Sequence, residues 1–168
     1  MNIIDFTNCI QLPCNYGGSE KKKKILYDGE EYLLKFPDPA REKNKPISYK
    51  NNVFSEYVGC KIFELLEIPV QKVILGKWIE SKDSNVILKE KVVVACCDFT
   101  KNADLLEVSE FSNGITDVDY HFTTDIKDVN YIISKLPENT NKQEFINRFW
   151  DVFIVDTLIG NVDRHLSK

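Results

Sequence analysis

Short alternations of apolar and polar residues in residues 2–35 predict several short β-strands with turns between them. The clearest pattern is a pair of apolar runs, residues 25–27 and 32–36, on either side of Asp28-Gly29-Glu30. Because Asp-Gly readily adopts the left-handed backbone of a tight turn, this pattern predicts a β-hairpin. Three prolines among polar residues then mark residues 37–50 as a loop.

The pattern changes to a helical spacing over residues 52–67, just before Pro69. The apolar residues that recur at this spacing are Phe54, Val58, Ile62, Leu65 and Leu66. After Pro69 the chain favours strands again, with one strand at residues 70–75 and a hairpin over residues 78–95. Residues 92–95 are rich enough in β-branched side chains to predict a central strand.

The rest of the chain favours helices. Residues 101–143 carry weaker patterns, with short helices expected at 103–110 and 126–135. From residue 143 to residue 159 apolar side chains cover nearly all sides of a helix, which predicts that this helix is buried. Gly160 stands where a glycine in the left-handed conformation commonly ends a helix.

Strands come first and helices follow, so the sequence predicts an α+β fold. Its N-terminal part is expected to be an antiparallel β-sheet lobe with one helix. The natural boundary lies near Asp98–Asn102. We therefore expect residues 1–99 to form the sheet lobe and residues 100–168 to form a helical part.

Composition and charge narrow the classes of function. The chain is 43% hydrophobic and 29% charged with a net charge of -4, so it is typical of a soluble globular protein without nucleic-acid binding. The run from Lys21 to Lys24 is more often a solvated turn than a binding patch. We expect no membrane span and no secretory signal. Five cysteines without metal-type spacing predict reduced thiols and a cytoplasmic location.

The first candidate site is Gly17-Gly18-Ser19, which lies between two predicted strands. Paired glycines let backbone N–H groups approach phosphate oxygens closely, so a hairpin here could fold over a nucleotide. A simple surface turn is the more frequent result of such a pair. The segment is not a Walker loop, because no Gly-Lys-Ser/Thr follows it.

A charged pair forms the second candidate site. Lys35 lies in an apolar strand on the same face as Leu33, and it needs a partner if it points inward. Glu56 is the candidate partner, because its helical neighbours include the small residues Gly59 and Cys60. In protein kinases a helix glutamate holds the strand lysine that contacts the ATP phosphates. Alternatively, both side chains face water at the edges of their elements.

The third candidate site follows the apolar helix in a Gly-Asn-x-Asp-x-His run. Asp163 could accept the proton of an attacking hydroxyl, and Asn161 could brace the loop. We expect His165 to pack within the loop and Asp156 to form a structural hydrogen bond near its base. The alternative is a polar tail after a helix.

With these residues together, the chain resembles the HipA-like protein kinases. Within them it is most similar to the cell-translocating kinase A family of bacterial serine/threonine kinases. The similar segments follow the order of the family and cover most of the chain apart from residues 101–143. They are residues 4–7, 16–18, 32–37, 54–58, 92–99 and 149–165.

The resemblance implies a kinase-like fold, in which the sheet lobe is followed by the first helices of an incomplete C-terminal lobe. It implies that Lys35 binds phosphates and pairs with Glu56, and that Asp163 is the catalytic base. The residues that would cover the phosphates are Gly17, Gly18 and Ser19. The residues that would form a hinge against adenine are Ala95, Cys96, Cys97, Asp98 and Phe99.

The implied cofactors are ATP and Mg²⁺. The implied reaction transfers the γ-phosphate to a serine or threonine hydroxyl of a protein substrate, or of the kinase itself, with Ser19 as one target. The resemblance also adds a secreted effector as an alternative to a cytoplasmic protein.

The chain departs from the family in its metal ligands. The family has a metal-binding Asn five residues after the catalytic Asp, where this chain has Lys168. An ammonium group has no lone pair to offer Mg²⁺. The Asp of the following DFG-like element is also absent, so the sequence assigns no metal ligand. We therefore expect a C-terminally truncated kinase that is weak or inactive by itself.

The alternative function is a non-catalytic, nucleotide-binding pseudokinase or a protein-interaction module. Without the rest of a C-terminal lobe, the helix at residues 144–159 is expected to expose part of its apolar surface. Such a surface favours association, so this helix is the expected docking site for a protein partner.

Overall fold

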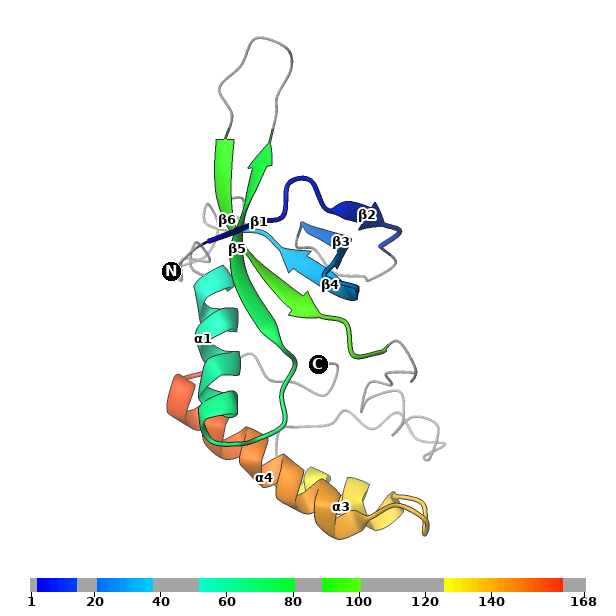
Figure 1. Ribbon diagram of the computed structural model, residues 1–168. Coiled ribbons are helices and arrows are strands. Elements are labelled where there is room, and N and C mark those ends of the chain that lie inside the picture. The colour runs from blue at the N-terminus through cyan, green and yellow to red at the C-terminus, as the bar shows by residue number, and fades with distance from the viewer. Residues whose placement is uncertain (1–2, 15–20, 38–51, 81–88, 101–125, 162–168) are drawn as a thin grey trace. The chain divides into compact units, whose positions relative to one another are not determined.

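The computed structural model describes five stretches of the chain: residues 3–14, 21–37, 52–80, 89–100 and 126–161. Contacts within the chain divide it into two compact units, Met1–Asn102 and Ala103–Lys168. Within the described residues, the first unit consists of a six-stranded sheet and helix α1, and the second contains helices α3 and α4 (Figure 1).

The sheet has the spatial order β1-β5-β6-β4-β3-β2. Its strands are β1 (Ile4–Asp5), β2 (Ile10–Leu12), β3 (Lys22–Tyr27), β4 (Glu30–Lys35), β5 (Val73–Glu80) and β6 (Lys89–Cys97). Four of the five strand pairs are antiparallel, and β1 runs parallel to β5 at one edge. The predicted α+β fold with a sheet lobe and one helix is confirmed, with this one parallel strand added.

The predicted hairpin is formed by β3 and β4. Asp28 and Gly29 both have positive φ, 51° and 77°, as a two-residue turn that follows the twist of its strands requires. Ile25 lies opposite Tyr32 on this hairpin, and both side chains are buried. The turn residues and the apolar runs therefore specify the same register.

The prediction for residues 70–95 was wrong in its boundaries. The expected strand at 70–75 and the expected start of a hairpin at 78 belong to one continuous strand, β5, which pairs with β6 along its whole length. Gly76 lies inside this strand. A glycine is needed at this position, because a Cβ there would stand 2.3 Å from the Phe6 ring. The break in the apolar pattern thus marks a close approach of β1. As predicted, β6 is a central strand.

Each face of the sheet has its own hydrophobic core. The first core is centred on Phe6 and consists of Phe6, Ile25, Tyr32, Leu34, Phe36, Trp78, Val93 and Ala95. The second lies where α1 (Asn52–Leu65) covers the sheet, and it consists of Val53, Val73, Val94 and Cys96. Alternation along β6 sends Val93 to one core and Val94 to the other.

Helix α1 is present where it was predicted, but a different face of it is buried. Val53 and Phe63 are its buried residues, whereas four of the five members of the predicted apolar stripe are exposed: Phe54 by 44%, Val58 by 52%, Leu65 by 81% and Leu66 by 49%. The helix carries apolar side chains on two sides, and periodicity alone does not show which side meets the sheet.

Helix α1 ends in a Schellman motif. The Ile68 N–H donates to the Phe63 carbonyl at 2.9 Å, and the Glu67 N–H donates to the Glu64 carbonyl at 3.1 Å. Glu67 has φ 56°, a left-handed conformation usually reserved for glycine. Pro69 follows and cannot continue the helix.

The second unit contains α3 (Ile126–Lys135) packed against α4 (Lys142–Ile159). The prediction of a helix at 126–135 is confirmed, and the predicted helix at 143–159 begins one residue earlier. Asn141 caps α4 by accepting from the Glu144 N–H at 3.2 Å. As predicted, Gly160 ends the helix, with φ 66°.

The apolar pattern's prediction that α4 is buried on nearly all sides was wrong, whereas the expectation that residues 144–159 expose part of their apolar surface is confirmed. Val155 and Asp156 are buried, whereas four large apolar side chains are between 40% and 69% exposed: Trp150, Phe153, Ile154 and Leu158. The helix therefore has one covered side and one apolar side that is open. The loop expected at 37–50, apart from Pro37, and the helix expected at 103–110 lie outside the described residues.

Candidate functional site

The structure brings Lys35 and Glu56 together. Lys35 is the last residue of β4, and Glu56 lies in the second turn of α1 on the side that faces the sheet. The Lys35 Nζ stands 2.7 Å from the Glu56 Oε1, and the two side chains are 25% and 29% exposed. A short, partly covered ion pair of this kind fixes both side chains relative to each other.

Gln71 and Cys96 approach the same carboxylate oxygen. The Gln71 Nε2 donates to the Glu56 Oε1 at 3.2 Å, and the Cys96 Sγ lies 3.8 Å from it. Gln71 comes from the loop between α1 and β5, and Cys96 from β6. Two further segments, the loop before β5 and strand β6, therefore hold Glu56 in place for Lys35. Sequence reasoning missed Gln71, because a single polar residue in a loop gives no signal of its partner.

The two thiols around this pair are held in their neutral form. Burial raises the pKa of Cys96 to about 12, since the nearby Lys35 charge offsets only part of that effect. Burial also raises the pKa of Cys60, and the Glu56 charge acts in the same direction. All five cysteines of the chain are free thiols. Cys96 and Cys60 therefore act here as neutral packing and hydrogen-bonding groups.

The expected hinge, residues 95–99, consists of the last three residues of β6 and the two residues that follow it. Two of its backbone N–H groups are occupied within the protein: Cys97 donates to the Lys72 carbonyl at 2.9 Å, and Asp98 donates to the Glu31 carbonyl at 2.8 Å. If this segment hydrogen-bonds adenine, it must therefore do so with backbone groups other than these two N–H groups. The Phe99 side chain is 62% exposed and open to contact with a flat ligand.

The Asp98 side chain has a structural role. Its carboxylate is 4% exposed, lies 2.8 Å from the Lys24 Nζ and accepts from the Thr100 N–H at 3.0 Å. Lys24 donates hydrogen bonds to Asp98 and to Glu31. Both bonds raise the pKa of Lys24, and the bond to Asp98 has the larger effect. The ion pair joins the expected hinge to β3, so it limits how far the hairpin and the hinge can separate.

In the second unit, Asp156 and Asn161 close the end of α4. The Asn161 Nδ2 donates to the Asp156 Oδ1 at 2.8 Å, and the Asn161 N–H donates to the Asp156 carbonyl at the same distance. Asp156 is thus a structural hydrogen-bonding group at the end of α4, with Asn161 as its partner. Asp163 and His165 lie outside the described residues, as do Gly17, Gly18 and Ser19.

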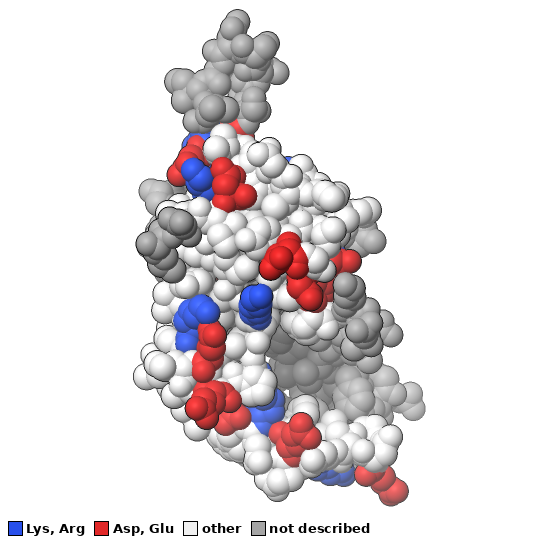
Figure 2. All heavy atoms as spheres, viewed as in Figure 1, with Lys and Arg blue, Asp and Glu red and all other residues white. Residues whose placement is uncertain are grey.

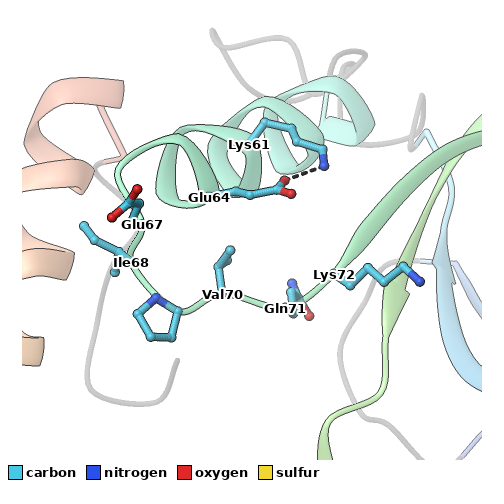
Figure 3. A pocket seen from close by; sticks show the side chains of 8 residues that line it. Lys61, Glu64, Glu67, Ile68, Val70, Gln71 and Lys72 are labelled. Atoms are coloured by element: carbon cyan, nitrogen blue, oxygen red, sulfur yellow. Dashed lines mark hydrogen bonds and ion pairs between the residues drawn. The ribbon is translucent and has the colours of Figure 1, made fainter.

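A pocket of about 310 Å³ lies beside this site, between the end of α1 and the loop that leads to β5 (Figure 3). Gln71 lines this pocket and also contacts Glu56. Figure 3 shows Val70 pointing toward α1, on which Lys61 pairs with Glu64. The walls carry both signs of charge, so the pocket has no clear preference for anions or cations.

The described residues contain no group of three or more His, Cys, Asp or Glu side chains that could hold a metal ion. Within these residues, no helix has the length and hydrophobicity that a membrane span requires. Figure 2 shows acidic and basic side chains in small neighbouring groups over the described part of the face in view.

Comparison with known proteins gives two findings. The chain is 37% identical over 175 residues to the serine/threonine-protein kinase CtkA of Helicobacter pylori strain J99, which covers 98% of this chain and 48% of that protein. It also matches the crystal structure of a proinflammatory kinase CtkA from Helicobacter pylori, with a TM-score of 0.79 and 35% identity over 99% of this chain and 53% of the other. The chain thus spans about half the length of these relatives. No family model matches it.

Proposed function

The chain belongs to the CtkA-like kinase family, and we propose that it binds ATP through Lys35 and supports phosphoryl transfer to serine or threonine hydroxyls. The observation that carries the proposal is the ion pair between Lys35 and Glu56 at 2.7 Å. A lysine held this way by a helix glutamate is the arrangement with which kinases position ATP phosphates. Gln71 and Cys96 support it by fixing the glutamate.

In the proposed reaction, the substrate hydroxyl oxygen forms a bond to the γ-phosphorus of ATP while the bond to the β,γ-bridging oxygen breaks. ADP leaves, and the hydroxyl proton passes to the carboxylate of Asp163. Lys35 contributes by neutralising phosphate charge, and Glu56 by holding the ammonium in position. A Mg²⁺ ion would supply further charge neutralisation, but no step here depends on one.

ATP binding is the direct test. We expect Lys35→Met to weaken ATP affinity about tenfold in equilibrium dialysis, because one charge-assisted hydrogen bond to phosphate is lost. Lys61→Met is the matched control, since Lys61 also pairs with a glutamate on α1 but is 41% exposed and far less enclosed. Its ATP affinity should stay within about twofold of wild type. Equal affinity of the Lys35→Met variant and wild type would contradict the proposal.

Phosphoryl transfer is tested separately with γ-labelled ATP. We expect at most weak incorporation into the chain or into an added protein substrate, and loss of that incorporation in Asp163→Ala. The second candidate function, nucleotide binding without transfer, is favoured by Lys168 in the place of the expected metal-binding Asn. It predicts the same ATP affinities in the binding test but no labelled protein with either Mg²⁺ or Mn²⁺.

A further inference from the structure

The pocket at the end of α1 has the size of a small-molecule site. Its volume is about 310 Å³, and ligand pockets in proteins have volumes of roughly 300–1,000 Å³. All of its lining residues lie between residues 61 and 72, in the last turns of α1 and the loop before β5. The pocket is therefore built within the first unit, and neither Lys35 nor Glu56 lines it.

The lining combines an apolar wall with charges that balance. Ile68, Pro69 and Val70 form the apolar part. Two lysines and two glutamates supply the charges, and Lys61 already pairs with Glu64. A charged ligand would lose its water on entry and would find no excess of the opposite charge to replace it. The pocket therefore favours a neutral molecule with an apolar body.

The Gln71 amide supplies an open hydrogen-bonding group in this lining. Its Nε2 is engaged, at 3.2 Å from the Glu56 Oε1 and 3.9 Å from the Cys60 Sγ. Among the described residues, none donates a hydrogen bond to the Gln71 Oε1. An amide oxygen has two lone pairs, so it can accept a hydrogen bond from a ligand while the nitrogen keeps its partners. The favoured ligand thus carries an N–H or O–H donor.

Gln71 also connects the pocket with the pair formed by Lys35 and Glu56, because the same amide lines the pocket and donates to Glu56. A donor on the Gln71 oxygen would hold the amide in this orientation and strengthen its N–H as a donor. A ligand that favours the intact pair and a nucleotide that uses the intact pair must strengthen each other's binding.

We propose that this pocket binds a neutral, largely apolar molecule with a hydrogen-bond donor, and that its occupation raises nucleotide affinity through Gln71. The effect on nucleotide affinity rests on the proposed function, whereas the occupation of the pocket does not.

Binding is tested with indole and benzofuran, which have nearly the same shape, although only indole carries an N–H donor. Each is titrated into the isotope-labelled full chain, and the backbone amide resonances are followed by NMR. We expect indole to shift resonances of residues 61–72, and benzofuran to bind there about fivefold more weakly because it cannot donate to Gln71. Indole shifts confined to other residues, or equal affinity for the two probes, would overturn the proposed site.

The effect on the nucleotide is tested by calorimetry, as ATP affinity with and without saturating indole. We expect indole to raise ATP affinity about fivefold in wild type and to have no such effect in Gln71→Leu, which lacks the amide. Lys72→Met is the matched control: Lys72 also lines the pocket, but its side chain extends away from Gln71 in Figure 3, so the increase should remain. Thermal unfolding checks that both variants fold.

The other outcomes separate the two proposals. ATP affinity that indole leaves unchanged in wild type would overturn the link through Gln71 and leave the proposed function standing. ATP affinity that indole lowers in both wild type and Gln71→Leu would show competition at the nucleotide site and would overturn the link as well. If wild type binds no ATP, the proposed function and the link fail together, and the NMR titration alone then decides whether the pocket is a ligand site.

Discussion

Single side chains in the sheet lobe hold several partners at once, and Glu56 is the central case. One of its oxygens faces Lys35, Gln71 and Cys96, which come from three different segments. The side chain therefore has little freedom to leave the lysine. Its position depends on the loop before β5 as much as on α1.

Glu80 is a second residue of this kind, and it makes stability depend on pH. Its carboxylate pairs with Lys21 and, at 2.8 Å, with Lys91. Hydrogen bonds from these two lysines lower the pKa of Glu80 from 4.5 to about 2, and the bond from Lys21 has the larger effect. Because the folded state binds this proton less readily than the unfolded state, the stabilisation is complete above about pH 4.5 and is lost as pH falls toward 2.

We expect Glu80→Gln to reduce the free energy of unfolding at pH 7 by about 1 kcal/mol, since the pair is partly screened by water. The difference from wild type should shrink as the pH is lowered to 3. Urea unfolding at both pH values measures it. Glu90→Gln is the control, because Glu90 is 57% exposed in its pair with Lys77 and should have little effect. A difference that grows in acid would contradict the pairing.

At the scale of elements, the two long helices end in the same motif with different residues. Gly160 takes the left-handed position after α4 with φ 66°, and Glu67 takes it after α1 with φ 56°. A residue with a Cβ is strained in this conformation by about 1 kcal/mol. Helix α1 therefore ends under strain that α4 avoids.

We expect Glu67→Gly to raise the free energy of unfolding by about 0.5–1 kcal/mol, because glycine adopts this conformation without a Cβ clash. Urea unfolding provides the measurement. Gly160→Ala is the converse variant: nothing lies within 4 Å of its added Cβ, so strain alone should destabilise the chain by about 1 kcal/mol. A destabilised Glu67→Gly variant would show that the Glu67 side chain contributes more than its strain costs.

Elements with local determinants could be predicted from the sequence. The turn at Asp28-Gly29 and the end of α4 at Gly160 are encoded by two or three neighbouring residues, and both were located correctly. The extent of β5 and the buried face of α1 were predicted wrongly. Each depends on a partner far away in the sequence, Phe6 for Gly76 and the sheet for Val53.

At the scale of the whole molecule, some features of the candidate site could likewise be predicted from the sequence, and others depend on partners far away in the sequence. The pairing of Lys35 with Glu56 was predicted because a kinase resemblance supplied the long-range information that the local pattern lacks. The contacts of Gln71 and Cys96 with Glu56 depend on loop placement and strand pairing, and so does the position of residues 22–24 in β3, where a solvated turn was expected. None of these features leaves a trace in periodicity, so all became visible only in three dimensions.

The edge of the sheet at β1 joins the N-terminal part of the first unit to strand β5. The Phe6 N–H donates to the Lys77 carbonyl at 3.0 Å, and the Thr7 hydroxyl accepts from the Ile79 N–H at 2.9 Å. An added Cβ on Gly76 would stand 2.3 Å from the Phe6 ring and 2.7 Å from the Ile4 carbonyl oxygen. The two strands therefore fit only when residue 76 is glycine.

We expect Gly76→Ala to lower the free energy of unfolding by about 1–3 kcal/mol through overpacking. Thermal or urea unfolding measures the loss. Adding Phe6→Leu to this variant should remove the ring contact but not the contact with the Ile4 oxygen, so the pair should cost less than the sum of the single changes. Additive losses would show that the ring does not set the constraint.

The contact between Thr7 and Ile79 spans 72 residues of sequence, which fixes an order of events during synthesis. Strand β1 leaves the ribosome first, but its partner follows only after roughly 4–14 s at 5–20 residues per second. Until then the Phe6 ring lacks the strand against which it packs at Gly76. The β3–β4 hairpin, by contrast, can close as soon as it emerges. Among the described strands, β1 is thus made before the others but paired late, and until then its unpaired edge is open to wrong partners.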